Sequence, residues 1–424
     1  MKTLTVQLDT KTCSLCGSSF GCAQGRPGCW CESVSVTRET MAGIRAMASD
    51  CICPACLSDF AGRAAPHGPH TWAKAVPDAD VRSRALRPFW AALAVAFLIV
   101  SLLLGLAVGP AKIGPAAVVA SLLSHLPAIH MSSPLSNVDE AILWQVRAPR
   151  VVLAALVGAM LAVAGSAYQG VFRNPLADPY LLGVAAGAGL GATLAIAYSG
   201  SGAYHPLLLP LAAFVGASVA VAAAYVLGRS AGAERGTTTL ILAGIVIALF
   251  LTAVQTFLQQ QRSETLREVY SWILGGFTAS DWSAVAVITP YVALSSLLIL
   301  LHRRVLDVLR LGEDEASSLG INVGRARLAL VIAATIGTAA AVAVSGLIGF
   351  VGIIVPHTIR LLVSPSYRAI VPLSLLAGAG FLVLADALAR TILSPAELPI
   401  GVVTAFFGAP FFAVVLRSTR KVTL

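Results

Sequence analysis

Apolar residues gather into long runs over most of this chain, and short polar segments separate these runs. A helix needs about 20 apolar residues to cross the hydrocarbon core of a bilayer, and most of the runs approach or reach that length. They predict an all-α polytopic membrane protein with about ten transmembrane helices. The runs lie near residues 89–109, 150–172, 184–198, 207–228, 237–259, 282–301, 327–345, 352–363, 371–391 and 400–416.

Two of the runs, 184–198 and 352–363, are too short for a full crossing. Short helices are tolerated at membrane depth where they are tilted or buried inside protein. Each short run is flanked by glycine and proline, and the two runs occupy corresponding positions in the two halves of the chain. We therefore predict an inverted internal repeat. Asn174-Pro175 and Asp178-Pro179 precede the first short run and are expected to break the helix there.

Composition supports the membrane assignment, since 57% of the 424 residues are hydrophobic, 12% are charged and the mean hydropathy is +0.83. These values are too apolar for a soluble protein of this length. When the runs are taken as alternating crossings, Lys and Arg concentrate on the side that holds both termini. Basic loops stay in the cytoplasm, so we predict cytoplasmic N- and C-termini.

All eight cysteines fall within the first 56 residues, which marks a separate module. We expect a cysteine-rich, metal-binding module at 1–60, a linker at 61–88 and a transmembrane domain at 89–424. Close cysteine pairs can place two thiolates on one metal ion, and eight sulfurs satisfy two Cys₄ zinc sites. Disulfides do not persist in a reducing compartment, which favours a metal. The spacing of the cysteines does not decide between zinc and an iron–sulfur cluster. If the module holds a cluster, it could reduce iron as the chelate arrives. The predicted ligands are Cys13, Cys16, Cys22, Cys29, Cys31, Cys51, Cys53 and Cys56.

The chain shows no sequence pattern for catalysis. None of its five lysines follows a glycine, which excludes a GxxxxGK[ST] phosphate-binding loop. Neither paired acids nor a nucleophile next to a base can be recognised. We therefore expect a protein that is not an enzyme, and that carries no ATP site of this type.

Several sequence blocks follow one another through the hydrophobic part of the chain. Arg147-Ala-Pro-Arg150 precedes a block of the form GxxLAxxGxxxQxxxxNPLAxPxxLG, which runs from Gly158 to Gly183. Further blocks are Trp272-x2-Gly275-Gly276, LGEDEASSLGINVGRAR, GLIGFVGIIVPHTIRLLV, LADALAR and ELPIGVVTAFFGAPFF. In this order they resemble the permease subunit of the FecCD-type ABC importers for ferric siderophores, haem and cobalamin. Around Cys29-Trp30-Cys31 the chain also resembles the small cysteine-rich Cys-Trp-Cys (CWC) family.

The resemblance implies a role for the charged segment 303–327, which lies between two apolar runs. In the family this cytoplasmic loop couples the permease to its ATPase subunit. The alternative is an ordinary solvated loop, which would not require this length or composition. The coupling residues implied are Leu311, Gly312, Glu313, Asp314, Glu315, Ala316, Leu319 and Gly320.

The resemblance also implies outward-facing arginines that pair with carboxylates of a substrate-binding protein. The matching positions are Arg147, Arg150 and Arg390. Exposed arginines opposite an acidic partner favour encounter rate and register more than affinity. Two alternatives stay open, because boundary arginines also extend their head groups to the interface, and Arg390 could pair with Asp386, four residues earlier on the same helix.

Polar residues recur at spacings of three and four on the fifth run, at Thr252, Gln255, Thr256 and Gln259. They predict one polar stripe, which could face a translocation path or form hydrogen bonds between helices. We expect His357 to be structural. Asp386 and Glu397 are expected to form structural pairs.

The function implied is that of a permease in the lipid of the bacterial inner (cytoplasmic) membrane. It would act as a homodimer with two ATP-binding subunits and a periplasmic substrate-binding protein. A ferric siderophore is the metal chelate expected first, with cobalamin and haem as alternatives, and no nucleic-acid partner is expected. An ion-coupled secondary transporter is the alternative class, since inverted repeats and broken helices occur there too.

Overall fold

A computed structural model describes residues 9–16, 18–22, 43–44, 48, 52–54, 56–57, 88–111, 113–125, 133–198, 207–230, 236–278 and 280–419. The chain divides into two compact units, Met1–Ala79 and Asp80–Leu424. The linker predicted at 61–88 lies outside the described residues, except that Pro88 begins the first long helix.

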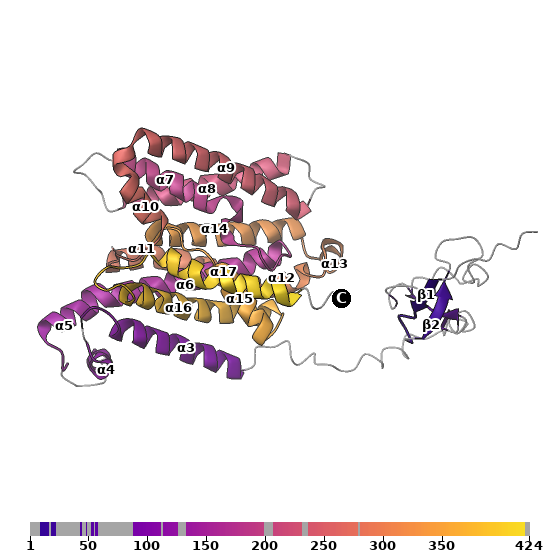
Figure 1. Cartoon of the computed structure of the whole chain (residues 1–424), viewed down its shortest axis with the longest axis horizontal. Coiled ribbons are helices and arrows are strands. Elements are labelled where there is room, and N and C mark those ends of the chain that lie inside the picture. Colours follow the sequence, from indigo (N-terminus) through magenta and orange to yellow (C-terminus); the bar gives the residue numbers. More distant parts are fainter. Residues whose placement is uncertain are drawn as a thin grey trace, which may run out of the picture. The chain divides into compact units, whose positions relative to one another are not determined.

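The smaller unit contains a two-stranded antiparallel sheet (Figure 1). Strand β1 (Asp9–Thr12) pairs with β2 (Ser19–Cys22), so that Asp9 lies opposite Cys22 and Thr12 opposite Ser19. A small core of this unit is formed by Cys13, Ile44, Ile52, Cys53 and Leu57. Two of these five residues are cysteines, so the cysteines help to build the core of the unit.

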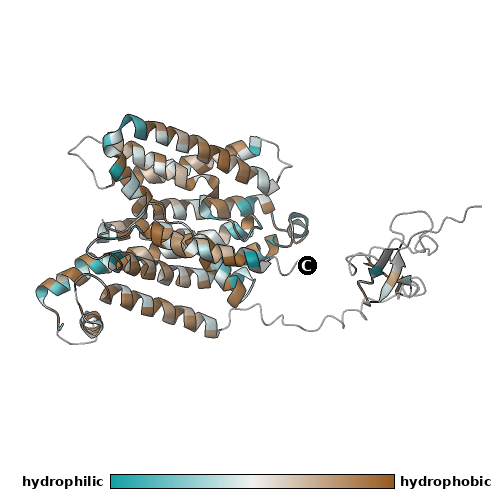
Figure 2. Ribbon diagram, in the orientation of Figure 1, coloured by the Kyte–Doolittle hydropathy of each residue, from teal (hydrophilic) through white to brown (hydrophobic). Residues whose placement is uncertain are grey.

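The larger unit is helical, and its helices follow the predicted apolar runs. Seven of the described helices are long and apolar enough to cross a membrane, and α7, α15 and α17 supply shorter apolar helices at the other three predicted positions. Figure 2 shows hydrophobic residues along the helices and hydrophilic ones mainly near their ends. The helices are α3 (Pro88–Ala107), α4 (Pro115–Ser124), α5 (Asn137–Ala141), η3 (Ile142–Arg147), α6 (Ala148–Val171), η4 (Pro179–Leu182), α7 (Val184–Tyr198), α8 (Leu208–Ser230), α9 (Gly236–Gln261), η5 (Ser263–Thr265), α10 (Leu266–Ile273), α11 (Trp282–Leu301), α12 (Arg303–Leu309), α13 (Glu313–Ser318), α14 (Val323–Ser345), α15 (Val351–Leu362), α16 (Tyr367–Thr391) and α17 (Ile400–Thr419).

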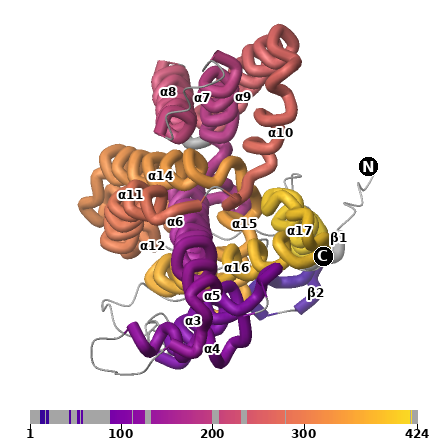
Figure 3. Tube along the Cα trace, turned by 90° about the vertical axis from the view of Figure 1, so that its left-hand side faces the viewer, coloured from indigo at the N-terminus to yellow at the C-terminus, as the bar shows by residue number. Residues whose placement is uncertain are grey.

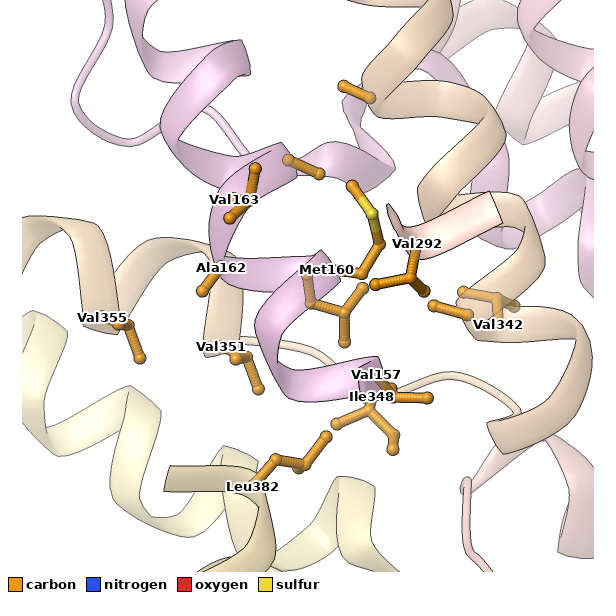
Figure 4. Close-up of a cluster of buried hydrophobic side chains, with 14 of the residues drawn as sticks. Val157, Met160, Ala162, Val163, Val292, Val342, Ile348, Val351, Val355 and Leu382 are labelled. Carbon is orange, nitrogen blue, oxygen red and sulfur yellow. The ribbon is translucent and has the colours of Figure 1, made fainter. Parts of the chain in front are cut away.

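Helix α6 is the central helix of the unit, and α14, α15 and α16 pack around it (Figure 3). Small residues permit this approach: a Cβ at Gly158 would overlap the Gly378 carbonyl, and one at Gly165 would overlap that of Gly352. Close packing of this kind holds helices together in lipid. Apolar side chains such as Met160 fill the remaining space around α6 (Figure 4).

The second span begins earlier than the sequence predicted. It was expected at 150–172, but one continuous helical segment runs from Asn137 to Val171. Its middle part, η3, is a π-helix, and Pro149 follows directly in the first turn of α6. A π-turn shifts the hydrogen-bond register, and proline has no N–H to donate. The helix therefore continues through Pro149 instead of beginning after it.

The backbone is irregular before each of the two short helices, and both irregular segments are held by protein groups. Asp178 accepts a hydrogen bond from the Tyr180 amide at 2.8 Å. The Tyr180 hydroxyl donates to the carbonyl of Ile348 at 3.0 Å and accepts from its amide at 3.2 Å. Non-helical backbone at membrane depth must be satisfied in this way. The predicted helix break at Asn174-Pro175 and Asp178-Pro179 is confirmed.

Candidate functional site

Helix α13 forms a short projection at one end of the bundle, which we call the α13 end; α4 and α5 mark the opposite α5 end (Figure 1). Ala316 faces inward and is fully buried, while Leu311 and Leu319 are 64% and 63% exposed. Gly312 and Gly320 bound the helix with positive φ angles of 140° and 81°, which suit glycine. The predicted coupling residues thus lie together on an exposed helical turn that presents two leucines.

One of the three consecutive carboxylates fixes this projection to the bundle. Glu313 pairs with Arg327 of α14, and its carboxylate lies 3.9 Å from the Arg173 guanidinium beyond the end of α6. Asp314 and Glu315 are exposed. The projection is therefore anchored through Glu313, and its other two acids are directed to its surface.

The three predicted docking arginines lie at the α5 end, but they are not exposed. Arg147, Arg150 and Arg390 are only 4%, 9% and 3% exposed within the single chain. Arg147 donates to the carbonyls of Leu106 at 2.8 Å and Ala107 at 3.1 Å, and also to that of Ala111. The expectation that these side chains are exposed is therefore wrong, whereas their role in docking a binding protein stays a prediction.

The end of α3 explains this burial. The last carbonyls of a helix have no partner within the helix, and Arg390 donates to two of those at the end of α3, Gly105 at 3.0 Å and Val108 at 3.2 Å. Arg147 serves the two carbonyls between them. Two arginines therefore cap the C-terminus of α3, where a positive charge is also favoured by the helix dipole.

Arg150 forms the centre of a charge cluster with the buried residues Asp386 and Arg390 and with Glu397 at its edge. Its guanidinium donates to Asp386 at 2.9 and 3.0 Å and to Glu397 at 2.9 and 3.0 Å. Asp386 also pairs with Arg390 at 3.0 Å. Structural pairing of Asp386 and Glu397 is confirmed, and so is the alternative in which Arg390 pairs with Asp386.

A cavity of about 1070 Å³ opens beside this cluster. Arg150 and Glu397 form part of its wall, together with Arg267, Trp272 and Asp281. The Glu397 side chain is 31% exposed, whereas that of Asp386 is 1% exposed. Within the cluster, Glu397 is therefore the carboxylate that water in the cavity can reach.

The polar residues of α9 do not form a single surface. Gln255 is buried and donates to the Thr193 hydroxyl of α7 at 3.1 Å. Thr252 and Thr256 are exposed, and Gln259 is half-buried. Hydrogen bonding between helices, one of the two alternatives, therefore describes Gln255. A role for Thr252, Thr256 and Gln259 in a translocation path stays a prediction.

His357 lies on α15 with its ring 6.1 Å from that of Phe411 on α17.

Sequence reasoning did not identify a second group of polar residues near the α13 end, which includes Asp307, Arg360 and Tyr367. Gln169 stood in the motif block on α6 without an assigned role. It donates to the Gly352 carbonyl at 3.1 Å and accepts from Arg360 at 3.0 Å.

In the smaller unit, four cysteines converge from two separate Cys-x2-Cys segments. The sulfurs of Cys13, Cys16, Cys53 and Cys56 all lie within 4.8 Å of one another. Cys13 and Cys56 are 3.9 Å apart, and Cys16 and Cys53 are 3.6 Å apart. The side chains of the other predicted ligands, Cys22, Cys29, Cys31 and Cys51, lie outside the described residues.

Electrostatics within this cluster favour a cation. Burial acts to raise the pKa of Cys13, but backbone N–H donors, with Cys53 first, outweigh it and lower that pKa to about 6. Hydrogen bonding from Cys53 raises the pKa of Cys56 to about 12. A cluster that already holds one thiolate resists forming others unless a positive charge joins it. Metal ligands must be deprotonated, so a cation would resolve this conflict.

Comparison with known proteins assigns the larger unit. Residues 97–418 match the profile of the FecCD transport family, which is well over half of the chain. The chain belongs to the FecCD transport family. At the N-terminus, residues 13–58 match the family described as Cysteine-rich CWC. Both predicted resemblances are confirmed.

Curated relatives of this FecCD chain include transport permeases from bacteria and archaea. The chain is 41% identical over 327 residues to YvrB of Bacillus subtilis, described as an uncharacterized ABC transporter permease, covering 76% of this chain and 91% of the relative. It is 41% identical over 278 residues to the cobalamin import permease BtuC of Halobacterium salinarum (66% and 74% covered). It is 40% identical over 283 residues to the hemin transport permease HmuU of Yersinia pestis (66% and 84% covered).

A solved structure shares the fold. An inward-facing metal-chelate type ABC transporter aligns with a TM-score of 0.68 at 30% sequence identity, covering 78% of this chain and all of that one. Membership of the FecCD transport family argues against the alternative prediction, an ion-coupled secondary transporter. The charge cluster disagrees as well, because Asp386, a buried acid of the bundle, is neutralised by two arginines.

Proposed function

We propose that this FecCD permease forms the membrane path of an ABC importer for a metal chelate. It acts as a homodimer with two ATP-binding subunits, and receives its cargo from a periplasmic substrate-binding protein. Membership of the family supports this proposal, as do the cobalamin import and hemin transport for which BtuC and HmuU are named. The α13 end lies in the cytoplasm, together with both termini of the chain.

The surface of α13 is the observation that carries the proposal. Two leucines, Leu311 and Leu319, are exposed on either side of the buried Ala316. Exposed apolar side chains on a polar projection are typical of a helix that lies in a groove of a partner. Glu313 holds the projection in place, so a force on it would reach α14 and α6 through Arg327 and Arg173.

A ferric siderophore is the cargo we propose, and haem and cobalamin are the competitors, since relatives at similar identity are named for hemin and cobalamin. The test is uptake into proteoliposomes that hold the permease, its ATPase subunit and its binding protein. Iron-55 ferric hydroxamate, haemin and labelled cyanocobalamin serve as probes. ATP-dependent accumulation of the iron chelate alone would support the assignment. Accumulation of haemin or cyanocobalamin instead would replace it, and accumulation without the ATPase subunit would overturn the importer.

We propose further that Cys13, Cys16, Cys53 and Cys56 bind one structural zinc ion. Four sulfurs at about 2.3 Å from a tetrahedral zinc lie roughly 3.8 Å apart, close to the separations of 3.6 and 3.9 Å here. In an iron–sulfur cluster the four thiolates are divided between two or four irons, which spreads the set of four sulfurs more widely than a single ion does. Metal analysis of the full chain tests this: zinc without visible absorbance, lost in Cys53→Ser, is expected. Bound iron with visible absorbance would support the iron-reducing alternative.

A further inference from the structure

A row of hydrogen bonds begins on α12, the short helix that leads to α13. The Asp307 carboxylate accepts from the Ser366 hydroxyl at 2.7 Å and from the Tyr367 amide at 2.6 Å. Both donors lie at the N-terminus of α16, where the free N–H groups and the helix dipole favour a negative charge. Asp307 therefore ties α12 to the start of α16.

The same row continues from Tyr367 into the middle of the bundle. The Tyr367 side chain is almost fully buried, and its hydroxyl accepts from Arg360 of α15 at 3.1 Å. Arg360 donates in addition to the Gln169 side chain of α6 at 3.0 Å. Gln169 in turn donates to the Gly352 carbonyl, in the first turn of α15, at 3.1 Å. Four side chains thus connect α12 with both ends of α15.

Arg360 has unusual surroundings for a charged group. Its side-chain hydrogen bonds among the described residues go to neutral oxygens, those of Gln169 and Tyr367, and its guanidinium lies 5.7 Å from the centre of the Tyr367 ring. Arg310 of the α13 end lies 5.9 Å from that ring centre and also donates to the Pro365 carbonyl. Arg360 is half-buried, and a cation that is partly removed from water and held by neutral partners depends on the geometry of each bond. A small shift of Tyr367 would therefore weaken the interactions that hold the Arg360 guanidinium in its position.

Helix α15 is the element on which this arrangement acts. It has 12 residues, too few for a full crossing. Phe350, directly before it, has a left-handed φ of 69°, and Gly346 one of 68°; such a conformation is costly for phenylalanine and persists only when the surroundings fix it. The bond from Gln169 to Gly352 is one of those constraints. Discontinuous helices of this kind line the binding and gating regions of transporters.

We propose that a relay of four side chains transmits movement of α12 and α13, the segment proposed to dock the ATPase subunit, to α15. The four are Asp307, Tyr367, Arg360 and Gln169. The proposal rests on the proposed function and deepens it. These residues are positioning residues: they contact neither nucleotide nor cargo, and they fix α15 in a position that depends on that of α12. When α12 moves, Asp307 displaces the start of α16, Tyr367 releases Arg360, and the constraint on the first turn of α15 changes.

The test uses Tyr367→Phe, which removes one hydroxyl and leaves the ring in place. Tyr168→Phe is the matched control, because the Tyr168 hydroxyl is equally buried but bonds to Thr335 at 2.9 Å, outside the relay. Both variants are studied as the full permease with its ATPase subunit and binding protein in proteoliposomes. We expect Tyr367→Phe to lower uptake of iron-55 ferric hydroxamate per ATP hydrolysed about tenfold, which converts to about 1.4 kcal/mol, and the control to lower it less than twofold.

A second measurement separates transmission from general damage to the fold. Hydrogen–deuterium exchange of residues 351–362 is followed with and without a non-hydrolysable ATP analogue. The wild type and Tyr168→Phe should show a nucleotide-dependent change in α15, and Tyr367→Phe should lose it while still hydrolysing ATP. Equal responses in the two tyrosine variants would overturn the relay alone. A wild type that neither binds an ATPase subunit nor responds to nucleotide would overturn the proposed function and the relay with it.

Asp307→Asn, at the other end of the relay, gives a test that does not depend on the folding of Tyr367→Phe. Its expected effect on uptake per ATP is of the same size. Because both substitutions interrupt one path, the double variant should lose about tenfold, whereas independent effects would multiply to about a hundredfold. A hundredfold loss would count against a shared path.

Discussion

Asp386→Asn tests how the charge cluster at the α5 end is built. Asp386 is fully buried, accepts hydrogen bonds from Arg150 and forms an ion pair with Arg390. Asparagine keeps the size of the side chain but removes the charge, leaving two buried guanidiniums with one carboxylate, Glu397. Removing one partner of a buried ion pair costs about 3–5 kcal/mol, because the other charge stays desolvated. We expect the free energy of unfolding to fall by that amount.

Two further variants serve as comparisons for the loss of unfolding free energy expected in Asp386→Asn. Glu397→Gln removes a carboxylate that water in the adjacent cavity can reach, and an ion pair of this kind contributes about 1 kcal/mol or less. Asp281→Asn is the matched control: Asp281 caps α11 through the Ala284 amide at 2.8 Å, and asparagine caps a helix about as well as aspartate. The control should change stability by less than about 0.5 kcal/mol.

The assay is equilibrium unfolding of the purified permease by sodium dodecyl sulfate in mixed micelles, followed by circular dichroism. The expected order of destabilisation is Asp386→Asn, then Glu397→Gln, then Asp281→Asn. If Asp386→Asn and the wild type have the same free energy of unfolding, the two arginines do not need the Asp386 charge to remain buried. They would then be free to meet an external carboxylate, as the sequence predicted.

The other predictions concern the helix contacts and the docking surface. Leu319→Asp should abolish co-purification of the ATPase subunit without changing the unfolding free energy, since the side chain is 63% exposed; retained co-purification would contradict a docking role. Gly165→Leu should prevent accumulation of folded protein in the membrane, because any Cβ there overlaps the Gly352 carbonyl, and normal expression would disprove the close approach of α6 and α15. Gln255→Leu should cost about 1 kcal/mol of stability through the lost bond to Thr193 while transport persists, and a selective loss of transport would return Gln255 to the translocation path.

Much of the helical fold could be predicted from hydrophobic patterning, because lipid requires long apolar segments and the sequence records their lengths directly. The short runs at 184–198 and 352–363 correctly indicated α7 and α15. The start of the second span was missed because η3 continues into α6 across Pro149, and a π-turn has no clear signature in sequence. Local patterns thus predicted the helices better than the irregular turn that joins two of them.

The relations between distant residues were predicted less well. Arg150 and Asp386 are 236 positions apart, and neither residue type nor local spacing indicates that they meet. The two Cys-x2-Cys segments were recognisable as candidate metal ligands, but their convergence on one cluster depends on the fold of the module. In the same way, the polar stripe on α9 was visible as a periodicity, whereas the partner that buries Gln255 lies on α7.

The docking arginines show why charge alone is a weak guide at the ends of membrane helices. In water, the terminal carbonyls of a helix bind solvent, so an arginine near them is free for other partners. Near the hydrocarbon boundary those carbonyls need donors from the protein, and a guanidinium supplies five N–H groups. Arg147 and Arg390 are used in this way at the end of α3. An RxPR motif at such a position is therefore compatible with a structural cap, and a docking role requires exposed surface that Arg147, Arg150 and Arg390 do not have in this conformation.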